Sequence, residues 1–187
     1  MLDHFDILAG VYENAIKLRD TEIWIRMAVL PTQGKLLDIG GGTGRVARAL
    51  APYTSGVIIS DLSFGMLSQG KKQTMLNQTQ AAAEQLPYPD NYFDRVIMVD
   101  AFHHIIDPQE TAQEMWRVTR PRGRIIIEEP DIRSPLIWLV AFIEKIALMR
   151  SRFISPPKIA NFFNSDISRI GIYRAGYSAW ILIDKMP

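Results

Sequence analysis

An apolar segment that leads into a glycine-rich turn constrains this chain more than any other feature. The segment Leu36 to Ile39 reads as a buried strand, and it is followed by Gly40, Gly41, Gly42 and Gly44. Glycine has no Cβ, so it adopts positive φ angles and lets a ligand lie against peptide groups. The helix expected next offers its first unpaired N–H groups to the same ligand. The turn therefore predicts a binding site for a small-molecule cofactor at the end of a strand.

Two kinds of cofactor use such a turn. The dinucleotide fingerprint reads G-x-G-x-x-G or G-x-G-x-x-A. Counted from Gly40, its third position is Arg45; counted from Gly42, it is Ala47, so this interpretation stays open. Asp38 stands just before the glycines, where a carboxylate repels a pyrophosphate and attracts an ammonium group. The spacing and this charge favour a ligand that carries an ammonium group.

The turn also resembles a family motif. Class I S-adenosylmethionine (SAM)-dependent methyltransferases carry D-x-G-x-G-x-G here, and the chain matches it with Asp38, Gly40, Gly42 and Gly44. Asp61 follows about 20 residues later, at the end of the next apolar segment, where a carboxylate accepts hydrogen bonds from ribose hydroxyls. That position supports a ribose without choosing between the two cofactors.

Two further segments strengthen the resemblance. Residues 61–67 are similar to the family's D-x-S-x-x-M-L segment. Residues 82–96 are similar to D-A-E-x-L-P-F-x-D-x-x-F-D-x-V, found in the methyltransferase type 11 branch that includes the ubiquinone and menaquinone C-methyltransferases. The chain has Ala82 where the family often has an aspartate that contacts the adenine amino group. The missing hydrogen bond costs on the order of 1 kcal/mol of cofactor affinity.

The resemblance implies SAM as the cofactor and S-adenosylhomocysteine as the product. Asp38 would hold the ammonium group and the glycine turn the methionine end, with Leu62 and Met66 on the adenine, although Met66 also suits a core position. The expected cofactor-binding residues are Asp38, Gly40, Gly41, Gly42, Gly44, Asp61, Leu62, Met66, Ala83, Glu84, Leu86 and Asp100.

Two adjacent histidines follow the expected strand 94–99, at the edge where open α/β sheets bind ligands. Methyl transfer attacks an already activated sulfonium methyl, so an enzyme chiefly positions two partners and excludes water. A general base helps only when the acceptor must lose a proton, and histidine suits that role near neutral pH. The resemblance implies His104 as the base, with His103 in reserve; a structural role for either stays open.

Strands and helices alternate after the glycine turn, which predicts an α/β fold: a Rossmann-like, doubly wound, mostly parallel sheet with helices on both faces. The expected strands are 34–39, 56–60, 80–83, 94–99 and 124–128, and the expected helices are 43–51, 64–76 and 108–119. The family usually ends with two antiparallel strands after an A-G-F turn, but only ten residues follow Ala175-Gly176-Tyr177. Two strands need about 12 or more. We therefore expect one strand, 179–183, a shortened C-terminal edge, and either a monomer or a homodimer that completes the sheet.

The chain length of 187 residues and a hydrophobic content of 48% fit a single domain. We divide it into an N-terminal helical cover (1–33), a cofactor-binding core (34–130), a helical substrate-cover insertion (131–165) and a C-terminal helix and strand (166–187).

Charge and composition exclude several classes of function. The net charge of +1 provides no global field for nucleic acid. The absence of cysteine excludes disulfides, thiolate metal sites and cysteine nucleophiles, and three histidines offer little for a metal centre, so no metal is expected. The N-terminus lacks the basic and apolar regions of a signal peptide, which predicts a cytoplasmic location.

Residues 136–149 form an apolar segment that is too short to span a bilayer, which needs roughly 20 residues. The resemblance implies that this segment and residues 5–12 cover the substrate. An apolar cover indicates a small hydrophobic acceptor, quinone-like or lipid-like, or a peripheral membrane contact; a helix buried in its own domain is an equal interpretation. The predicted function is methyl transfer from SAM to this acceptor. An NAD-dependent oxidoreductase and a catalytically weakened module that binds a nucleoside or a partner remain as alternatives.

Overall fold

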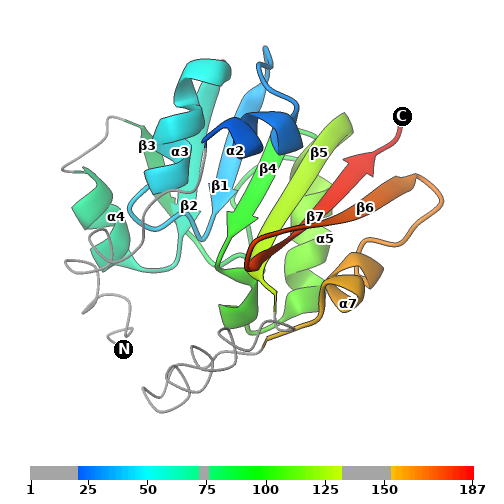
Figure 1. Cartoon of the computed structure of the whole chain (residues 1–187). Helices are drawn as coiled ribbons and strands as arrows, with labels where there is room; N and C mark the ends of the chain where they lie inside the picture. Colours follow the sequence, from blue (N-terminus) through cyan, green and yellow to red (C-terminus); the bar gives the residue numbers. More distant parts are fainter. Residues whose placement is uncertain (1–20, 72–75, 132–152) are drawn as a thin grey trace.

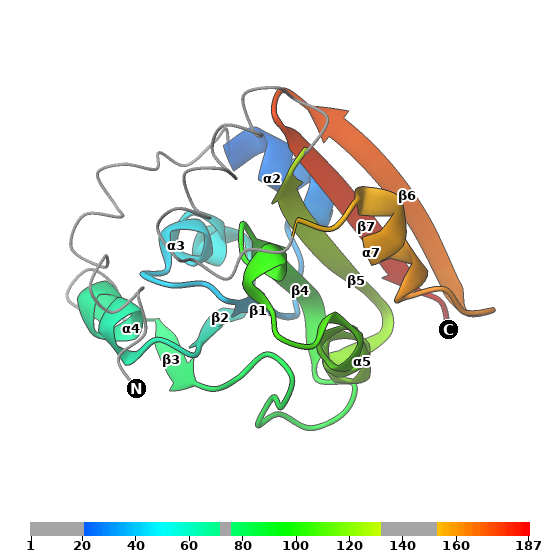
Figure 2. The same cartoon turned by 90° about the horizontal axis from the view of Figure 1, so that it is seen from below.

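The computed structural model describes residues 21–71, 76–131 and 153–187. A twisted sheet runs through the molecule, with helices against both of its faces (Figures 1 and 2). The strands are β1 (Lys35–Ile39), β2 (Gly56–Asp61), β3 (Asn77–Gln80), β4 (Phe93–Val99), β5 (Thr119–Pro130), β6 (Ser168–Ala175) and β7 (Ser178–Lys185). The α-helices are α2 (Thr21–Ala28), α3 (Arg45–Leu50), α4 (Phe64–Lys71), α5 (Pro108–Val118) and α7 (Pro156–Asn161), and the short 3-10 helices are η1 (Ala51–Tyr53) and η2 (Phe102–His104).

The seven strands lie in the order β3-β2-β1-β4-β5-β7-β6. Strands β1 to β5 pair in parallel, whereas β7 is antiparallel to both β5 and β6. The order reverses between β1 and β4, and in open α/β sheets ligands bind beside the carboxyl ends of the strands at such a switch point. The predicted doubly wound, mostly parallel sheet is confirmed, and it brings the ends of β1, β2 and β4 to one edge.

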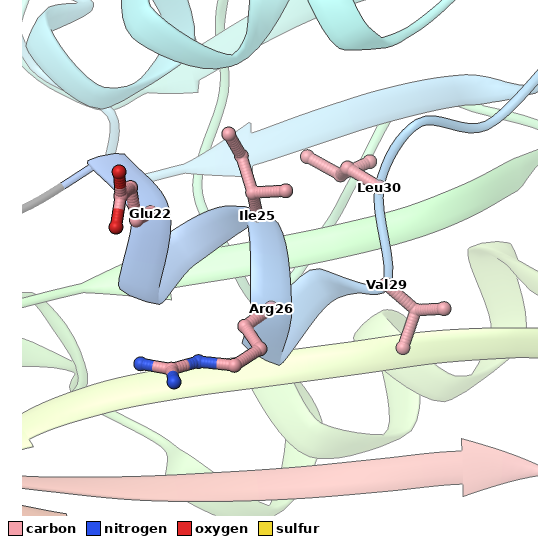
Figure 3. A pocket seen from close by; sticks show the side chains of 5 residues that line it. All are labelled: Glu22, Ile25, Arg26, Val29 and Leu30. Carbon is pink, nitrogen blue, oxygen red and sulfur yellow. The ribbon is translucent and has the colours of Figure 1, made fainter.

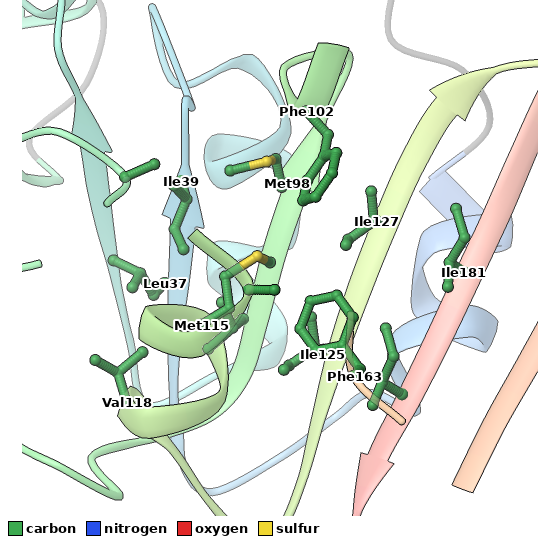
Figure 4. Close-up of a cluster of buried hydrophobic side chains, with 14 of the residues drawn as sticks. Leu37, Ile39, Met98, Phe102, Met115, Val118, Ile125, Ile127, Phe163 and Ile181 are labelled. Carbon is green, nitrogen blue, oxygen red and sulfur yellow. The ribbon is translucent and has the colours of Figure 1, made fainter. Parts of the chain in front are cut away.

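Two buried clusters fix the strands between the helical layers. The first packs α5 and α7 on one face of the sheet (Figure 4), and the second packs α2, α3 and α4 on the other. Successive side chains of β5 point to opposite faces, so Ile125 and Ile127 belong to the first cluster and Ile126 to the second. Trp24 of α2 meets Trp180 of β7 edge to face, with ring centroids 4.5 Å apart.

The expected shortened C-terminal edge is wrong. The turn at Gly176 and Tyr177 joins two strands instead of preceding both, because β6 comes before it and pairs with β7 over the full length of both strands. Gly176 has φ +60°, and glycine is the usual residue at the first position of such a two-residue hairpin loop. Residues 166–187 thus supply two strands, where a helix and one strand were expected.

The bounds of the other strands differ less from the predicted ones. Strand β3 covers Asn77–Gln80, three residues before its predicted position, because it is a polar edge strand without an apolar pattern. Strand β5 begins at Thr119, five residues earlier than expected. The N-terminal cover up to residue 20 and the apolar segment 136–149 lie outside the described residues, and α7 is the part of the expected insertion that forms a described helix.

Two arginines from the sheet hold the C-terminal end of α2. Arg124 donates to both carboxylate oxygens of Asp184, at 2.6 and 2.8 Å, and to the Met27 carbonyl at 2.9 Å. Arg95 donates to the carbonyls of Ala28 and Val29. The last carbonyls of a helix lack partners within the helix, so these guanidinium groups satisfy them.

We expect the Arg124→Met variant to lower the free energy of unfolding by about 2 kcal/mol, because a carbonyl and a carboxylate lose charged donors while the aliphatic stem remains. Chemical denaturation measures the change. The control is Arg122→Met, which replaces an exposed arginine two residues away. Equal losses in both variants would contradict a specific role for Arg124.

Candidate active site

The glycine turn after β1 is tied to the end of β2. The N–H groups of Gly40 and Gly41 both point to the Ser60 carbonyl, at 2.7 and 3.3 Å. Gly40, Gly42 and Gly44 have φ angles of +65°, +55° and +79°. Residues that carry a Cβ rarely adopt these φ angles. The sequence folds into this turn because glycine occupies all three positions.

The turn is also approached closely from two sides. A Cβ on Gly40 would lie 2.7 Å from the Cβ of Ala101, which follows β4. A Cβ on Gly42 would lie 3.0 Å from the Cε of Met66, which belongs to α4. The backbone after β1 therefore sits between the segments that follow β2 and β4, as a shared cofactor site requires.

Asp61 is held rigidly at the end of β2. Its Oδ2 accepts the Gly42 N–H and its Oδ1 accepts the Ser63 N–H, both at 2.8 Å. Each carboxylate oxygen has a second lone pair. The predicted ribose contact stays a prediction, but the carboxylate that would make it is fixed against the glycine turn.

Asp38 lies beneath the turn. Its side chain is 1% exposed, and neither carboxylate oxygen has a hydrogen-bond partner among the described residues. A Cβ on Gly41 would come within 2.7 Å of its Cγ. Burial raises the pKa of Asp38 to about 7, and the negative charge of Asp61 adds to the shift. The charge of Arg45 and the nearby Ala47 N–H, which is too poorly placed for a regular hydrogen bond, lower the pKa. A buried carboxylate with only partial compensation is stabilised by a further nearby cation, so this site fits the positively charged end of SAM.

Beside Asp61, Leu62 is 56% exposed and Phe64 is exposed as well. An exposed leucine next to the carboxylate that is predicted to bind the ribose suits contact with an adenine face, as the resemblance implied. Met66 is buried and touches the turn, so it has the core position that the sequence left open.

Three other predicted cofactor residues have structural contacts. The Oε1 of Glu84 accepts the N–H groups of Ile106 and Asp107, at 3.2 and 3.3 Å, and so holds the loop after η2. Leu86 and Ala83 are buried in the first core cluster. A cofactor contact for any of the three stays a prediction.

The segment after β4 is organised by Glu129, which the sequence analysis missed. Its Oε1 accepts the N–H groups of Ala101 and Phe102, at 3.1 and 2.8 Å, and its Oε2 lies 2.6 Å from Nδ1 of His103. Asp100, the preceding residue, has φ +49°. The available signal was a glutamate at the end of an apolar strand, at the same sheet edge as the histidines.

The two histidines differ in environment. The ring of His103 stacks on Phe153, with centroids 4.8 Å apart and an interplanar angle of 11°. Burial lowers the pKa of His104 to about 3, and the charge of His103 contributes. His104 is therefore neutral near pH 7 and a weak base, and its predicted catalytic role stays a prediction.

A pocket of about 440 Å³ lies elsewhere, beside α2 (Figure 3). It is lined by Glu22, Ile25, Arg26, Val29 and Leu30. None of these residues belongs to the glycine turn or to the segments that approach it.

The strand order, the glycine turn after β1 and the carboxylates of Asp38 and Asp61 define a class I SAM-dependent methyltransferase. Residues 37–127 match the family described as a methyltransferase domain. The chain belongs to this methyltransferase family, whose cofactor is SAM.

Curated relatives agree with this assignment, and a solved structure agrees with the fold. The chain is 32% identical over 135 residues to the ubiquinone/menaquinone biosynthesis C-methyltransferase UbiE of Coxiella burnetii, covering 67% of this chain and 54% of the relative. It is 31% identical over 133 residues to a demethylmenaquinone methyltransferase of Paenarthrobacter aurescens, covering 67% and 53%. The chain thus spans about half the length of these curated relatives. A methyltransferase solved in complex with the Haloferax volcanii Trm112 methyltransferase activator is similar in fold, with a TM-score of 0.81, 17% identity and full coverage of both chains.

Proposed function

We propose that the chain transfers the methyl group of SAM to a small hydrophobic acceptor and releases S-adenosylhomocysteine. The observation that carries this proposal is the glycine turn over the buried carboxylate of Asp38, whose oxygens make no regular hydrogen bond to any described residue. Asp38 attracts the ammonium group, Asp61 accepts hydrogen bonds from the ribose hydroxyls, and Leu62 packs on the adenine. The methionine end lies on the glycine turn.

Methyl transfer from SAM requires the protein chiefly to position the two reactants and to exclude water. SAM supplies a methyl group that its positive sulfur already activates. The glycine turn and Asp61 fix where that methyl group points, and the aromatic residues after β4 exclude water from the acceptor side. A proton acceptor is needed only if the methylated atom carries a hydrogen.

Two observations support a hydrophobic, quinone-like acceptor. His103 stacks on Phe153, which places an aromatic ring beside the segment that follows β4. The first relative named above is a ubiquinone/menaquinone biosynthesis C-methyltransferase and the second is a demethylmenaquinone methyltransferase, which favours carbon as the methylated atom.

A peripheral membrane contact would bring such an acceptor to the site. The structure has no helix in its described segments that is both long and apolar enough to cross a bilayer. Flotation with lipid vesicles tests the peripheral contact, and protein that stays at the bottom of the gradient contradicts it. Sedimentation in the same buffer distinguishes a monomer from a homodimer.

The alternatives are weaker on this structure. The common dinucleotide-binding order is 3-2-1-4-5-6, whereas here an antiparallel β7 is inserted next to β5. The presence of β6 removes one of the two reasons to suspect a weakened module. Ala82 remains as the other.

Titration calorimetry tests the proposal with SAM, S-adenosylhomocysteine and NADH in separate runs. We expect binding of the first two and none of NADH. No heat with SAM or S-adenosylhomocysteine at millimolar concentration would contradict the proposal. For the acceptor, methyl-labelled SAM is incubated with demethylmenaquinone, and label in the quinone fraction is the expected result.

A further inference from the structure

On the basis of the proposed methyl transfer, we infer that Glu129 is a positioning residue that orients His103 to take the proton from the methyl acceptor. No motif of the sequence pointed to Glu129. It lies at the carboxyl end of β5, next to β4 in the sheet, and His103 lies in η2 just after β4.

One carboxylate performs two tasks here. The Oε1 of Glu129 accepts two backbone N–H groups, from Ala101 and Phe102. The Oε2 lies 2.6 Å from Nδ1 of His103. Glu129 and His103 are 3% and 4% exposed, so water competes little for these bonds.

This pairing sets the tautomer of the ring. A carboxylate is an acceptor, so the neutral His103 ring donates its proton from Nδ1 to Glu129. The lone pair is then on Nε2, and the negative charge of Glu129 stabilises the imidazolium that forms when Nε2 takes a proton. The same division of labour between a carboxylate and a histidine operates in other general-base sites.

The same carboxylate also places the ring relative to the methyl donor. Glu129 holds the N–H of Ala101, and Ala101 is the residue that a Cβ on Gly40 would touch at 2.7 Å. The turn after β4 is therefore fixed against the glycine turn and to His103 by one side chain. One side chain thus connects the expected methyl-donor site to the proposed base.

His104 is less suited to the task. Burial lowers its pKa to about 3, whereas a general base works best with a pKa near the operating pH. Glu129 from β5 and His104 from η2 are titratable groups that face His103 in the part of the chain that the structure describes. The inference reverses the order of preference that the family resemblance implied.

The proton and electron balance is simple. The acceptor atom forms a bond to the methyl carbon, and the carbon–sulfur bond breaks with its electron pair going to sulfur. The hydrogen on the acceptor atom leaves as a proton to Nε2 of His103. Solvent removes that proton after the products leave.

The first test uses the whole chain labelled with nitrogen-15 in histidine, with the signals assigned through a His103→Gln variant. By NMR we expect His103 to carry its proton on Nδ1 and to titrate at a higher pH than His104. An Nε2–H tautomer, or a titration below that of His104, would overturn the inference. This measurement does not depend on the stability of any Glu129 variant.

The second test is Glu129→Gln. The amide oxygen can still accept the N–H groups of Ala101 and Phe102, but an NH₂ group now faces Nδ1 of His103. We expect the Nε2–H tautomer, a titration midpoint about one pH unit lower or more, and SAM affinity within about threefold of the wild type.

The matched control is Glu114→Gln. Glu114 likewise accepts a backbone N–H, from Leu86, and pairs with a cation, Arg117. We expect no change in the His103 spectrum of this variant. An unchanged His103 titration in Glu129→Gln, or a loss of SAM affinity of about tenfold, would show a merely structural Glu129. If the wild type fails to bind SAM, the proposed function fails while the tautomer measurement still decides the pairing.

Discussion

The Asp38→Asn variant is expected to gain stability relative to the wild type as pH rises, by about 2 to 3 kcal/mol between pH 5 and pH 8. The pKa of Asp38 is about 7 in the folded protein, whereas that of an exposed aspartate is 3.8. Protonated Asp38 therefore favours the folded state. Its contribution is complete below pH 3.8 and is lost as pH rises through 7, because folding then buries a charge. Asparagine carries no such charge at any pH.

The comparison between variant and wild type is essential because His104 acts in the opposite direction. Its pKa falls from 6.5 to about 3 on folding. This contribution to stability is present above pH 6.5 and is lost as pH falls through 3. The wild-type curve alone therefore contains two opposing slopes between pH 5 and pH 6.5, and only the difference between the two proteins isolates Asp38.

Urea unfolding of both ligand-free proteins at pH 5, 6, 7 and 8 gives this difference. The control is Asp166→Asn, which makes the same aspartate-to-asparagine change at an exposed position. We expect its stability to run parallel to the wild type. Parallel curves for Asp38→Asn as well would show that Asp38 is ionised without cost in the folded protein.

The same carboxylate links cofactor binding to pH. A ligand with an ammonium group stabilises ionised Asp38 and opposes the effect of burial on its pKa. The affinity of the wild type for SAM should therefore increase as pH rises through 7. The Asp38→Asn variant should bind more weakly, with less dependence on pH.

The cofactor side of the site could be predicted because its signals are local. Asp38 and the glycines lie within seven consecutive residues, and the φ angles of Gly40, Gly42 and Gly44 admit few other residues. The position of Asp61 could be predicted because it ends the second strand of one strand–helix–strand unit, about 20 residues after the glycine turn. The central strands β1 and β4 are short apolar segments bounded by turn residues, and their buried positions match that pattern.

The edge strands, the contact between Glu129 and His103 and the support of α2 depend on pairings between segments that are distant in the sequence. Strands β3 and β6 lie at the two edges of the sheet and carry polar or exposed residues, so only their partners reveal them. Glu129 and His103 are 26 residues apart, and they meet because β5 lies beside β4. The support of α2 by Arg95 and Arg124 likewise requires the folded sheet. Local patterns indicate none of these contacts.

Replacing Asp61 by alanine should have the largest effect on cofactor binding. The change removes the acceptor of the ribose hydroxyls and leaves the N–H groups of Gly42 and Ser63 without their partner. Hydrogen bonds to charged groups contribute about 1.5 to 3 kcal/mol each. The loss of two ribose bonds therefore predicts a fall in SAM affinity of about 100-fold or more. Titration calorimetry at pH 8 measures it.

Asp107→Ala is the matched control, because Asp107 also accepts two backbone N–H groups, from Gln109 and Glu110, each at 2.9 Å. Both variants should lose a similar free energy of unfolding, since each leaves two N–H groups without a carboxylate. Only Asp61→Ala should lose affinity for SAM. A comparable affinity loss in both would mean that the ribose contact is absent and that the effect comes from loosened structure. Affinity retained in Asp61→Ala would place the ribose elsewhere, and the assignment of the whole cofactor to the glycine turn would then have to change.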